Sequence, residues 1–176
     1  MYTNVMLMDK KYNIEMEDFA LNLEERQKKI TELKRKQKQQ NLLKGLSPRI
    51  GLTPESFLTV EETQRLLHAA FQKIDRADNL AKSEPSIESF IQRLSDTLAE
   101  VVLPPDTEVI LFLYEEGEIE AVKLEFRALQ ENFSLLLPLT GFTQGRFDIL
   151  IVQPQLRFGL CVERGEYEYT FASWGF

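Results

Sequence analysis

Residues 107–126, with the sequence TEVILFLYEEGEIEAVKLEF, decide the fold class that we expect for this chain. A run rich in β-branched and aromatic residues extends from Glu108 to Tyr114, a Glu-Glu-Gly turn follows at 115–117, and a second run extends from Ile119 to Phe126. Two such runs around a short turn that contains glycine predict an antiparallel hairpin. In the second run the apolar positions shift from odd to even numbers after Ala121, which predicts a β-bulge there.

Further strand patterns follow the hairpin. Phe133 to Leu139 is predicted as a third strand, which Pro138 would restrict to an edge of the sheet because proline lacks the backbone N–H. Three more strands joined by tight turns are predicted at Arg146–Gln153, Leu156–Glu163 and Glu166–Trp174. The C-terminal half is therefore expected to form an antiparallel β-meander of five or six strands.

Helical patterns fill the chain before the hairpin. A long helix is predicted from about Asp18 to Lys44, because this segment lacks Pro and Gly and is followed by Gly45 and Pro48. Apolar residues spaced by three and four predict two shorter amphipathic helices, one with Leu66, Leu67, Ala70, Phe71 and Ile74, the other with Ile87, Phe90, Ile91, Leu94 and Leu98. Helices followed by hairpin-connected strands predict an α+β fold with the helices on one face of the sheet. The predicted core comprises Phe71, Leu94, Phe112, Phe147, Ile149, Ile151, Phe158 and Leu160.

The charge changes along the chain, which carries a formal net charge of −7 over 176 residues. Glu24 to Arg49 contains nine Lys or Arg against three Glu, whereas Ile50 to Phe176 contains ten against 21 Asp or Glu. We therefore expect an N-terminal segment, residues 1–49, that holds a long basic helix, and a compact acidic α+β domain at residues 50–176. Lys and Arg of the basic helix, residues 26–49, could bind nucleic acid through its phosphates, but the segment has no aromatic residue for base stacking, so this stays an alternative interpretation.

The long helix also carries a partial heptad spacing. Phe19, Leu23, Ile30 and Leu33 follow steps of four and three, while Arg26, Gln37 and Gln40 occupy further positions of the same series. A homodimer through the N-terminal helix is therefore a second interpretation of this segment.

Cysteine and histidine counts exclude several kinds of chemistry. Because Cys161 is the single cysteine, the chain cannot form an intramolecular disulfide or a zinc ribbon. Because His68 is the single histidine, a His-rich metal site is excluded as well. Cys161 lies in the middle of a predicted strand without neighbouring cations, where a nucleophilic thiolate is not stabilised. We expect no catalytic residue, no metal and no cofactor. A hydrolase of unknown substrate, using Cys161 or a pair of carboxylates, is the enzymatic alternative.

Apolar runs in this chain are short. The longest, Val109 to Tyr114, has six residues, where a membrane span needs about 20. Met1 to Met8 is too short and too polar for the apolar region of a secretory signal. These patterns predict a cytoplasmic protein that does not bind a membrane.

Glutamates gather near two predicted hairpin turns. Under a six-stranded meander, both turns would lie at the same end of the sheet and form one acidic, tyrosine-bearing patch. Such a patch steers and holds a basic surface. The candidate partner-binding residues are Glu115, Glu116, Glu118, Glu120, Glu166 and Glu168.

A compact acidic α+β domain without a catalytic constellation resembles bacterial immunity proteins as a class. This resemblance implies a small non-enzymatic binding protein, an inhibitor or immunity-type protein that neutralises a basic protein partner such as a nuclease.

Overall fold

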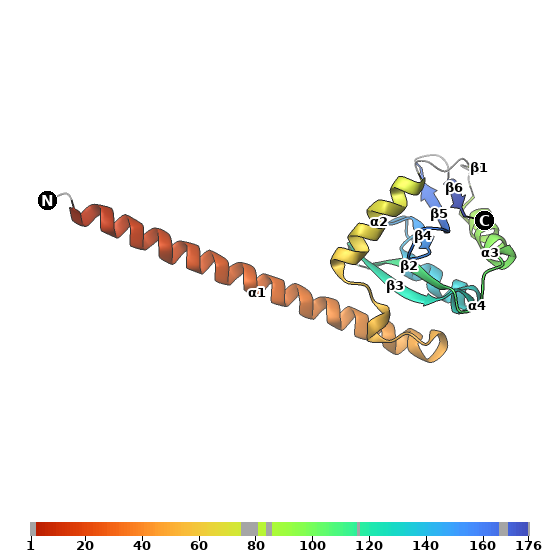
Figure 1. Ribbon diagram of the computed structural model, residues 1–176, viewed down its shortest axis with the longest axis horizontal. Helices are drawn as coiled ribbons and strands as arrows, with labels where there is room; N and C mark the ends of the chain where they lie inside the picture. The colour runs from red at the N-terminus through yellow and green to blue at the C-terminus, as the bar shows by residue number, and fades with distance from the viewer. Residues whose placement is uncertain (1–2, 75–80, 84–85, 116, 166–168, 176) are drawn as a thin grey trace. The chain divides into compact units, whose positions relative to one another are not determined.

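The computed structural model describes residues 3–74, 81–83, 86–115, 117–165 and 169–175 of the chain (Figure 1). The chain divides into two compact units, Met1–Lys44 and Gly45–Phe176. The first unit consists of helix α1 (Thr3–Ile50) up to Lys44, and the last turns of this helix belong to the globular unit.

Helix α1 is longer at both ends than the predicted helix from Asp18 to Lys44. It continues through Gly45 and Pro48, so the predicted stop is wrong. The side chains of Leu46 and Ile50 are buried in the globular unit, at 4% and 8% exposure, and their burial stabilises the extra turns. The helix ends only at Gly51, whose φ of 72° lies in the left-handed region that glycine tolerates best.

The globular unit is built on an antiparallel sheet of six strands in the order β1-β6-β5-β4-β2-β3. The α+β fold with N-terminal helices and a C-terminal antiparallel sheet is confirmed. The strands are β1 (Ala81–Ser83), β2 (Glu108–Glu115), β3 (Glu118–Glu125), β4 (Ile149–Val152), β5 (Gly159–Arg164) and β6 (Tyr169–Trp174). Only β4, β5 and β6 form a simple meander, because β4 pairs with β2 rather than with β3.

The predicted third strand, Phe133–Leu139, is wrong. These residues lie in helix α4 (Phe126–Leu136) and the short 3-10 helix η2 (Leu137–Thr140). The apolar residues of α4 repeat at helical spacing and are buried on one face, namely Phe126, Leu129, Phe133 and Leu136. This helix carries the chain back from the edge strand β3 to β4.

The predicted bulge near Ala121 is also absent from the hairpin as described. Strands β2 and β3 pair residue for residue, from Glu108 opposite Glu125 to Glu115 opposite Glu118. Ala121 and Val122 are both fully buried although they point to opposite faces. The shifted apolar pattern thus reflects two covered faces and not an extra residue.

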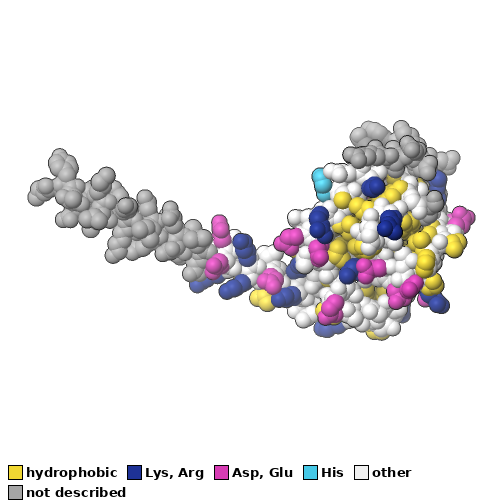
Figure 2. Space-filling view, viewed as in Figure 1, with side chains coloured by type: hydrophobic (Ala, Val, Ile, Leu, Met, Phe, Trp, Pro, Cys, Tyr) yellow, Lys and Arg dark blue, Asp and Glu magenta, His cyan; other side chains and the backbone are white. Residues whose placement is uncertain are grey.

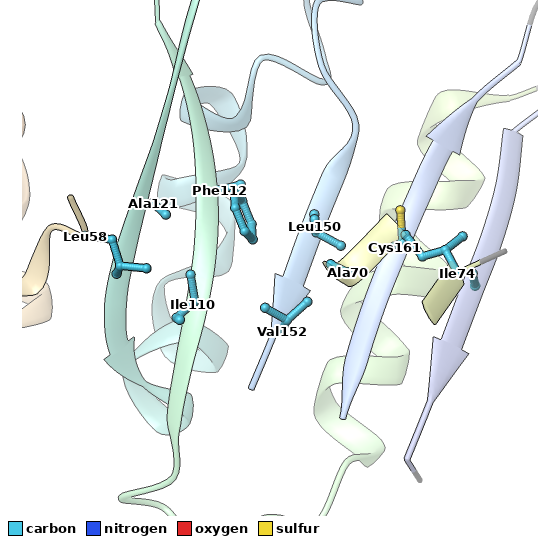
Figure 3. Close-up of a cluster of buried hydrophobic side chains, with 10 residues drawn as sticks. Leu58, Ala70, Ile74, Ile110, Phe112, Ala121, Leu150, Val152 and Cys161 are labelled. Atoms are coloured by element: carbon cyan, nitrogen blue, oxygen red, sulfur yellow. The ribbon is translucent and has the colours of Figure 1, made fainter. Parts of the chain in front are cut away.

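Helices cover both faces of the sheet, so the expectation of one helical face is wrong (Figure 1). Helix α2 (Val60–Ile74) packs on one face and contributes Ala70 and Ile74 to the buried cluster shown in Figure 3. On the other face, the Phe126 ring of α4 contacts Phe158, and the Phe90 ring of α3 (Ile87–Glu100) contacts Tyr169.

Most of the predicted core is confirmed. Leu94, Phe112, Ile149, Ile151, Phe158 and Leu160 are buried, whereas Phe71 and Phe147 are half-buried at the margin of the α2 cluster. Among the described residues, no helix is long and apolar enough to span a bilayer.

Candidate functional site

A cleft of about 530 Å³ opens beside the base of the β2–β3 hairpin, at the end opposite its turn. Four carboxylates and one lysine line it, namely Glu55, Asp106, Glu108, Glu125 and Lys123. A second hollow of about 270 Å³ shares Glu55, Glu108 and Lys123 with the first and adds Glu62 and Arg65 of α2. We call the two together the acidic cleft.

The segment that leaves α1 positions Glu55. After Gly51 the chain enters the short 3-10 helix η1 (Pro54–Ser56), where the Thr53 N–H donates a hydrogen bond of 3.1 Å to Ser56 Oγ. The Leu58 N–H then donates to the Ala121 carbonyl oxygen of β3 at 2.9 Å. The segment is thereby fixed along the free edge of β3, which places Glu55 in the same cleft as Lys123.

The start of α4 positions Asp106 and Glu125. Glu125 is the N-cap residue of this helix, but its side chain makes no capping hydrogen bond. The first N–H groups of the helix instead donate to loop carbonyls, Phe126 to Thr107 at 2.8 Å and Arg127 to Pro105 at 3.4 Å. Because the loop supplies these acceptors, the Glu125 carboxylate is not used as a cap.

Hydrogen bonds keep two of the cleft glutamates ionised. The Thr53 hydroxyl lowers the pKa of Glu55, with a smaller contribution from the Glu55 backbone N–H. The Thr59 backbone N–H and hydroxyl lower the pKa of Glu62, and both donors lie within 3.0 Å of Glu62 Oε2. This is the capping box that begins α2. Both carboxylates therefore stay negatively charged to lower pH than a free glutamate does.

Cations balance this charge only in part. The Lys123 Nζ atom lies 3.9 Å from Glu108 Oε2, and both side chains are about half exposed. An exposed pair at this distance contributes little to stability. Beneath the charged rim, the buried side chains of Ile50, Leu52 and Leu124 form part of the cleft lining. The cleft therefore carries an excess of negative charge, and buried apolar residues form part of its wall.

The predicted partner-binding glutamates lie at the other end of the hairpin. Glu115 and Glu118 form the last β2–β3 pair before the turn, and Glu118 is exposed. Glu120, opposite Leu113, is only 3% exposed, so it presents almost no surface to a partner. Glu116, Glu166 and Glu168, with the side chain of Glu115, lie outside the described residues.

Strands β2 and β5, which precede the two predicted glutamate-rich turns, end at the same edge of the sheet. Strands β2 and β5 are separated by β4, which is antiparallel to both, so they run in the same direction. Both are followed by a hairpin connection at that end. The topology that produces this arrangement is a helical crossover and not the expected six-stranded meander.

Sequence reasoning missed the acidic cleft. Its carboxylates come from three separate segments, and only the pairing of β2 with β3 and the attachment of Leu58 to Ala121 bring them together. The one local signal was the capping box of Thr59 and Glu62, which indicates a helix start and says nothing about a cleft.

Cys161 and His68 lie in different environments. Cys161 is fully buried in the α2 cluster, and burial, followed by the charges of Glu163 and Asp148, raises its thiol pKa well above the ordinary value. Such a thiol is a poor nucleophile. His68 is exposed on α2, with its Nε2 atom 3.0 Å from Gln72 Nε2. Within the part of the chain that the structure describes, no group of three or more His, Cys, Asp or Glu could hold a metal ion.

Charged side chains of both signs share the visible face of the globular unit. Figure 2 shows acidic and basic side chains around a group of hydrophobic ones on this face. In α1, by contrast, exposed cations predominate, namely Lys28, Lys29, Lys34 and Lys36. The carboxylate of Glu32 lies 2.9 Å from the Lys36 ammonium.

Residues 42–174 match the family model described as YxiF protein. No curated protein and no solved structure matches the chain.

Proposed function

The chain belongs to the YxiF family, whose model spans nearly the whole globular unit, and we propose that this unit is a non-enzymatic binding module of the inhibitor or immunity type. Its partner would be a protein with a basic surface, which it neutralises by covering that surface. The family match begins at residue 42, so the family is defined by the globular unit rather than by most of the basic helix.

The acidic cleft is the observation that carries this proposal. A lysine or arginine side chain has a long aliphatic stem and a charged end. In the cleft, the stem would lie along the lining, while the exposed carboxylates of Glu108 and Glu125 would receive the cation at the rim. Arginine fits best, because its guanidinium can bind a carboxylate through two hydrogen bonds.

A macromolecular partner is favoured over a small substrate by the exposure of the charged groups. Glu108 and Lys123 are 53% and 40% exposed, and Asp106 and Glu125 are exposed as well. Exposed carboxylates act mainly by steering an oppositely charged partner and fixing its orientation. General acid catalysis would instead need a carboxyl group whose pKa is raised in a water-excluded site.

The alternatives receive less support. A hydrolase that uses Cys161 would need a thiolate, and this thiol is buried with a raised pKa. A nucleic-acid-associated protein would use the exposed basic residues of α1, and its binding to generic RNA would fall steeply with salt. Retention on RNA that survives removal of the acidic cleft would favour this second candidate.

Three forms of the full chain test the proposal as baits in the cell of origin. The first is the wild type, the second carries Glu108→Lys and Glu125→Lys in the acidic cleft, and the third carries Glu116→Lys and Glu118→Lys at the hairpin turn. Both variants change the net charge equally, so the third controls for charge alone. We expect one basic protein to be recovered with the wild type and the third form but lost with the second. Equal recovery by all three would refute the acidic cleft as the binding surface.

A further inference from the structure

Helix α1 carries an apolar stripe that the globular unit does not explain. Leu23, Ile30 and Leu33 are 43%, 53% and 66% exposed, although leucine and isoleucine at steps of seven and three are typical of a coiled-coil interface. All three precede Gly45, where the globular unit begins. An exposed helix with this spacing lacks the packing that normally stabilises it.

The same spacing extends toward the N-terminus. Steps of four and three from Val5 to Gln40 pass through eleven positions, of which seven are apolar, namely Val5, Tyr12, Met16, Phe19, Leu23, Ile30 and Leu33. The helix is continuous from Thr3 to Ile50, so these positions share one stripe when the helix supercoils. We call them the helix seam. Its polar positions are Asp9, Arg26, Gln37 and Gln40.

The two charged seam positions decide how two copies can pair. In a parallel pair, each seam position faces its own copy, so Asp9 would meet Asp9 and Arg26 would meet Arg26 in the interface. Residues 26–44, with eight Lys or Arg against one Glu, would also lie beside the same basic stretch of the partner. Like charges that face each other across a coiled-coil interface repel and oppose pairing.

An antiparallel pair removes this conflict in one register. When Asp9 of one helix lies opposite Arg26 of the other, Val5 lies opposite Ile30, Tyr12 opposite Leu23, and Met16 opposite Phe19. Every other seam position between Val5 and Ile30 then meets an apolar partner, and the single acidic position meets the single basic one. Shifting the register by one heptad places Asp9 opposite an apolar residue, Phe19 or Leu33.

We propose that α1 binds a second copy of this chain as an antiparallel coiled coil, in the register that places Asp9 opposite Arg26. The apolar layers supply the affinity, and the two symmetry-related ion pairs select orientation and register, which is the best attested use of buried polar groups in coiled coils. Leu33, Gln37 and Gln40 lie beyond the paired seam positions, which run from Val5 to Ile30, so the basic residues from Lys34 onward stay in solvent.

Charge exchange in the full chain tests the register. We expect light scattering to give the mass of a dimer for the wild type. Asp9→Arg or Arg26→Asp alone should weaken dimerisation by at least about tenfold, because each leaves like charges opposed. The combined variant Asp9→Arg, Arg26→Asp should restore it. Lys28→Asp, which makes the same change in charge outside the helix seam, should leave the dimer intact. A monomeric wild type at its highest soluble concentration, or single variants as dimeric as the wild type, would refute the proposal.

Cross-linking tests the orientation independently. Val5→Cys and Ile30→Cys proteins are oxidised separately and as a mixture, while the buried Cys161 stays protected in each. An antiparallel pair gives a mixed disulfide between the two variants. Rapid disulfide formation within either variant alone, at the expense of the mixed product, would show a parallel pair and contradict the inference.

Discussion

Glu108 and Glu125 lie directly opposite each other in the first pair of the β2–β3 ladder. Two like charges in this relationship destabilise a sheet, and the nearby Lys123 ammonium compensates Glu108 from 3.9 Å. Two facing carboxylates at the base of a hairpin contribute little to folding, whereas they concentrate negative potential at the mouth of the acidic cleft. This arrangement fits the proposed role of the acidic cleft, in which its carboxylates attract a basic protein surface.

Replacing Glu108 should therefore leave the fold almost unchanged. Glu108→Lys exchanges repulsion from Glu125 for attraction and loses the attraction of Lys123, so the two effects offset each other. We expect the free energy of unfolding to change by less than about 0.5 kcal/mol, measured by urea denaturation. Glu118→Lys at the hairpin turn is the matched control. A loss of several kcal/mol would mean that Glu108 has a structural role.

Two phenylalanines of the predicted core should differ in importance. Phe158 is 3% exposed, with its ring 6.0 Å from the Phe126 ring, so Phe158→Ala should cost about 3–5 kcal/mol. Phe147 is half-buried and stacks on Tyr114, so Phe147→Ala should cost less. Urea denaturation of both variants gives the comparison. Equal costs would contradict the burial that distinguishes them.

Gly159 should not tolerate a methyl group. It pairs with Trp174 across β5 and β6, and a Cβ atom on Gly159 would overlap the indole ring. Gly159→Ala should cost about 1–3 kcal/mol and shift the fluorescence of the single tryptophan as its Nε1–H loses the bond to the Leu156 carbonyl oxygen. Gly45→Ala is the control, because a Cβ on this helical glycine meets no atom within 4 Å, and alanine favours the helix. An unchanged tryptophan spectrum in Gly159→Ala would contradict this account.

Asp148 should make stability depend on pH. Burial raises the pKa of its carboxyl, although the Arg164 backbone N–H, 2.9 Å from Oδ1, opposes the shift. Because the folded pKa is above the unfolded one, the stabilising contribution is complete below the unfolded pKa and is lost as pH rises through the folded pKa. The free energy of unfolding of Asp148→Asn, relative to that of the wild type, should therefore increase as the pH rises from 3 to 7. Urea denaturation across this range measures the difference, and a gain confined to low pH would refute the assignment.

The hairpin at 107–126 was predictable because alternation, propensity and a glycine turn agree there. Phe133–Leu139 was not, since a short apolar run fits a buried helix as well as a strand. Assigning Phe126 to the preceding strand concealed the helical series that it begins with Leu129 and Phe133. Sequence also predicted helices on one face, although strands that are apolar on both faces need cover on both.

The site was less predictable than the fold. Glu120 sits among acidic turn residues in sequence, yet the residue is only 3% exposed in the folded chain. The acidic cleft depends on contacts between Leu58 and Ala121 and between the 105–107 loop and α4, which no local pattern announces.

The rate of association with the basic partner decides whether the acidic cleft is the binding surface. It is measured for the wild type, for Glu108→Lys with Glu125→Lys, and for Glu116→Lys with Glu118→Lys, at low and at high salt. We expect charge reversal in the acidic cleft to slow association by roughly tenfold or more at low salt and by less at high salt, because screening shortens the reach of the charges. Reversal at the hairpin turn should have a weaker effect. Equal rates for the wild type and the cleft variant at low salt would contradict the proposal.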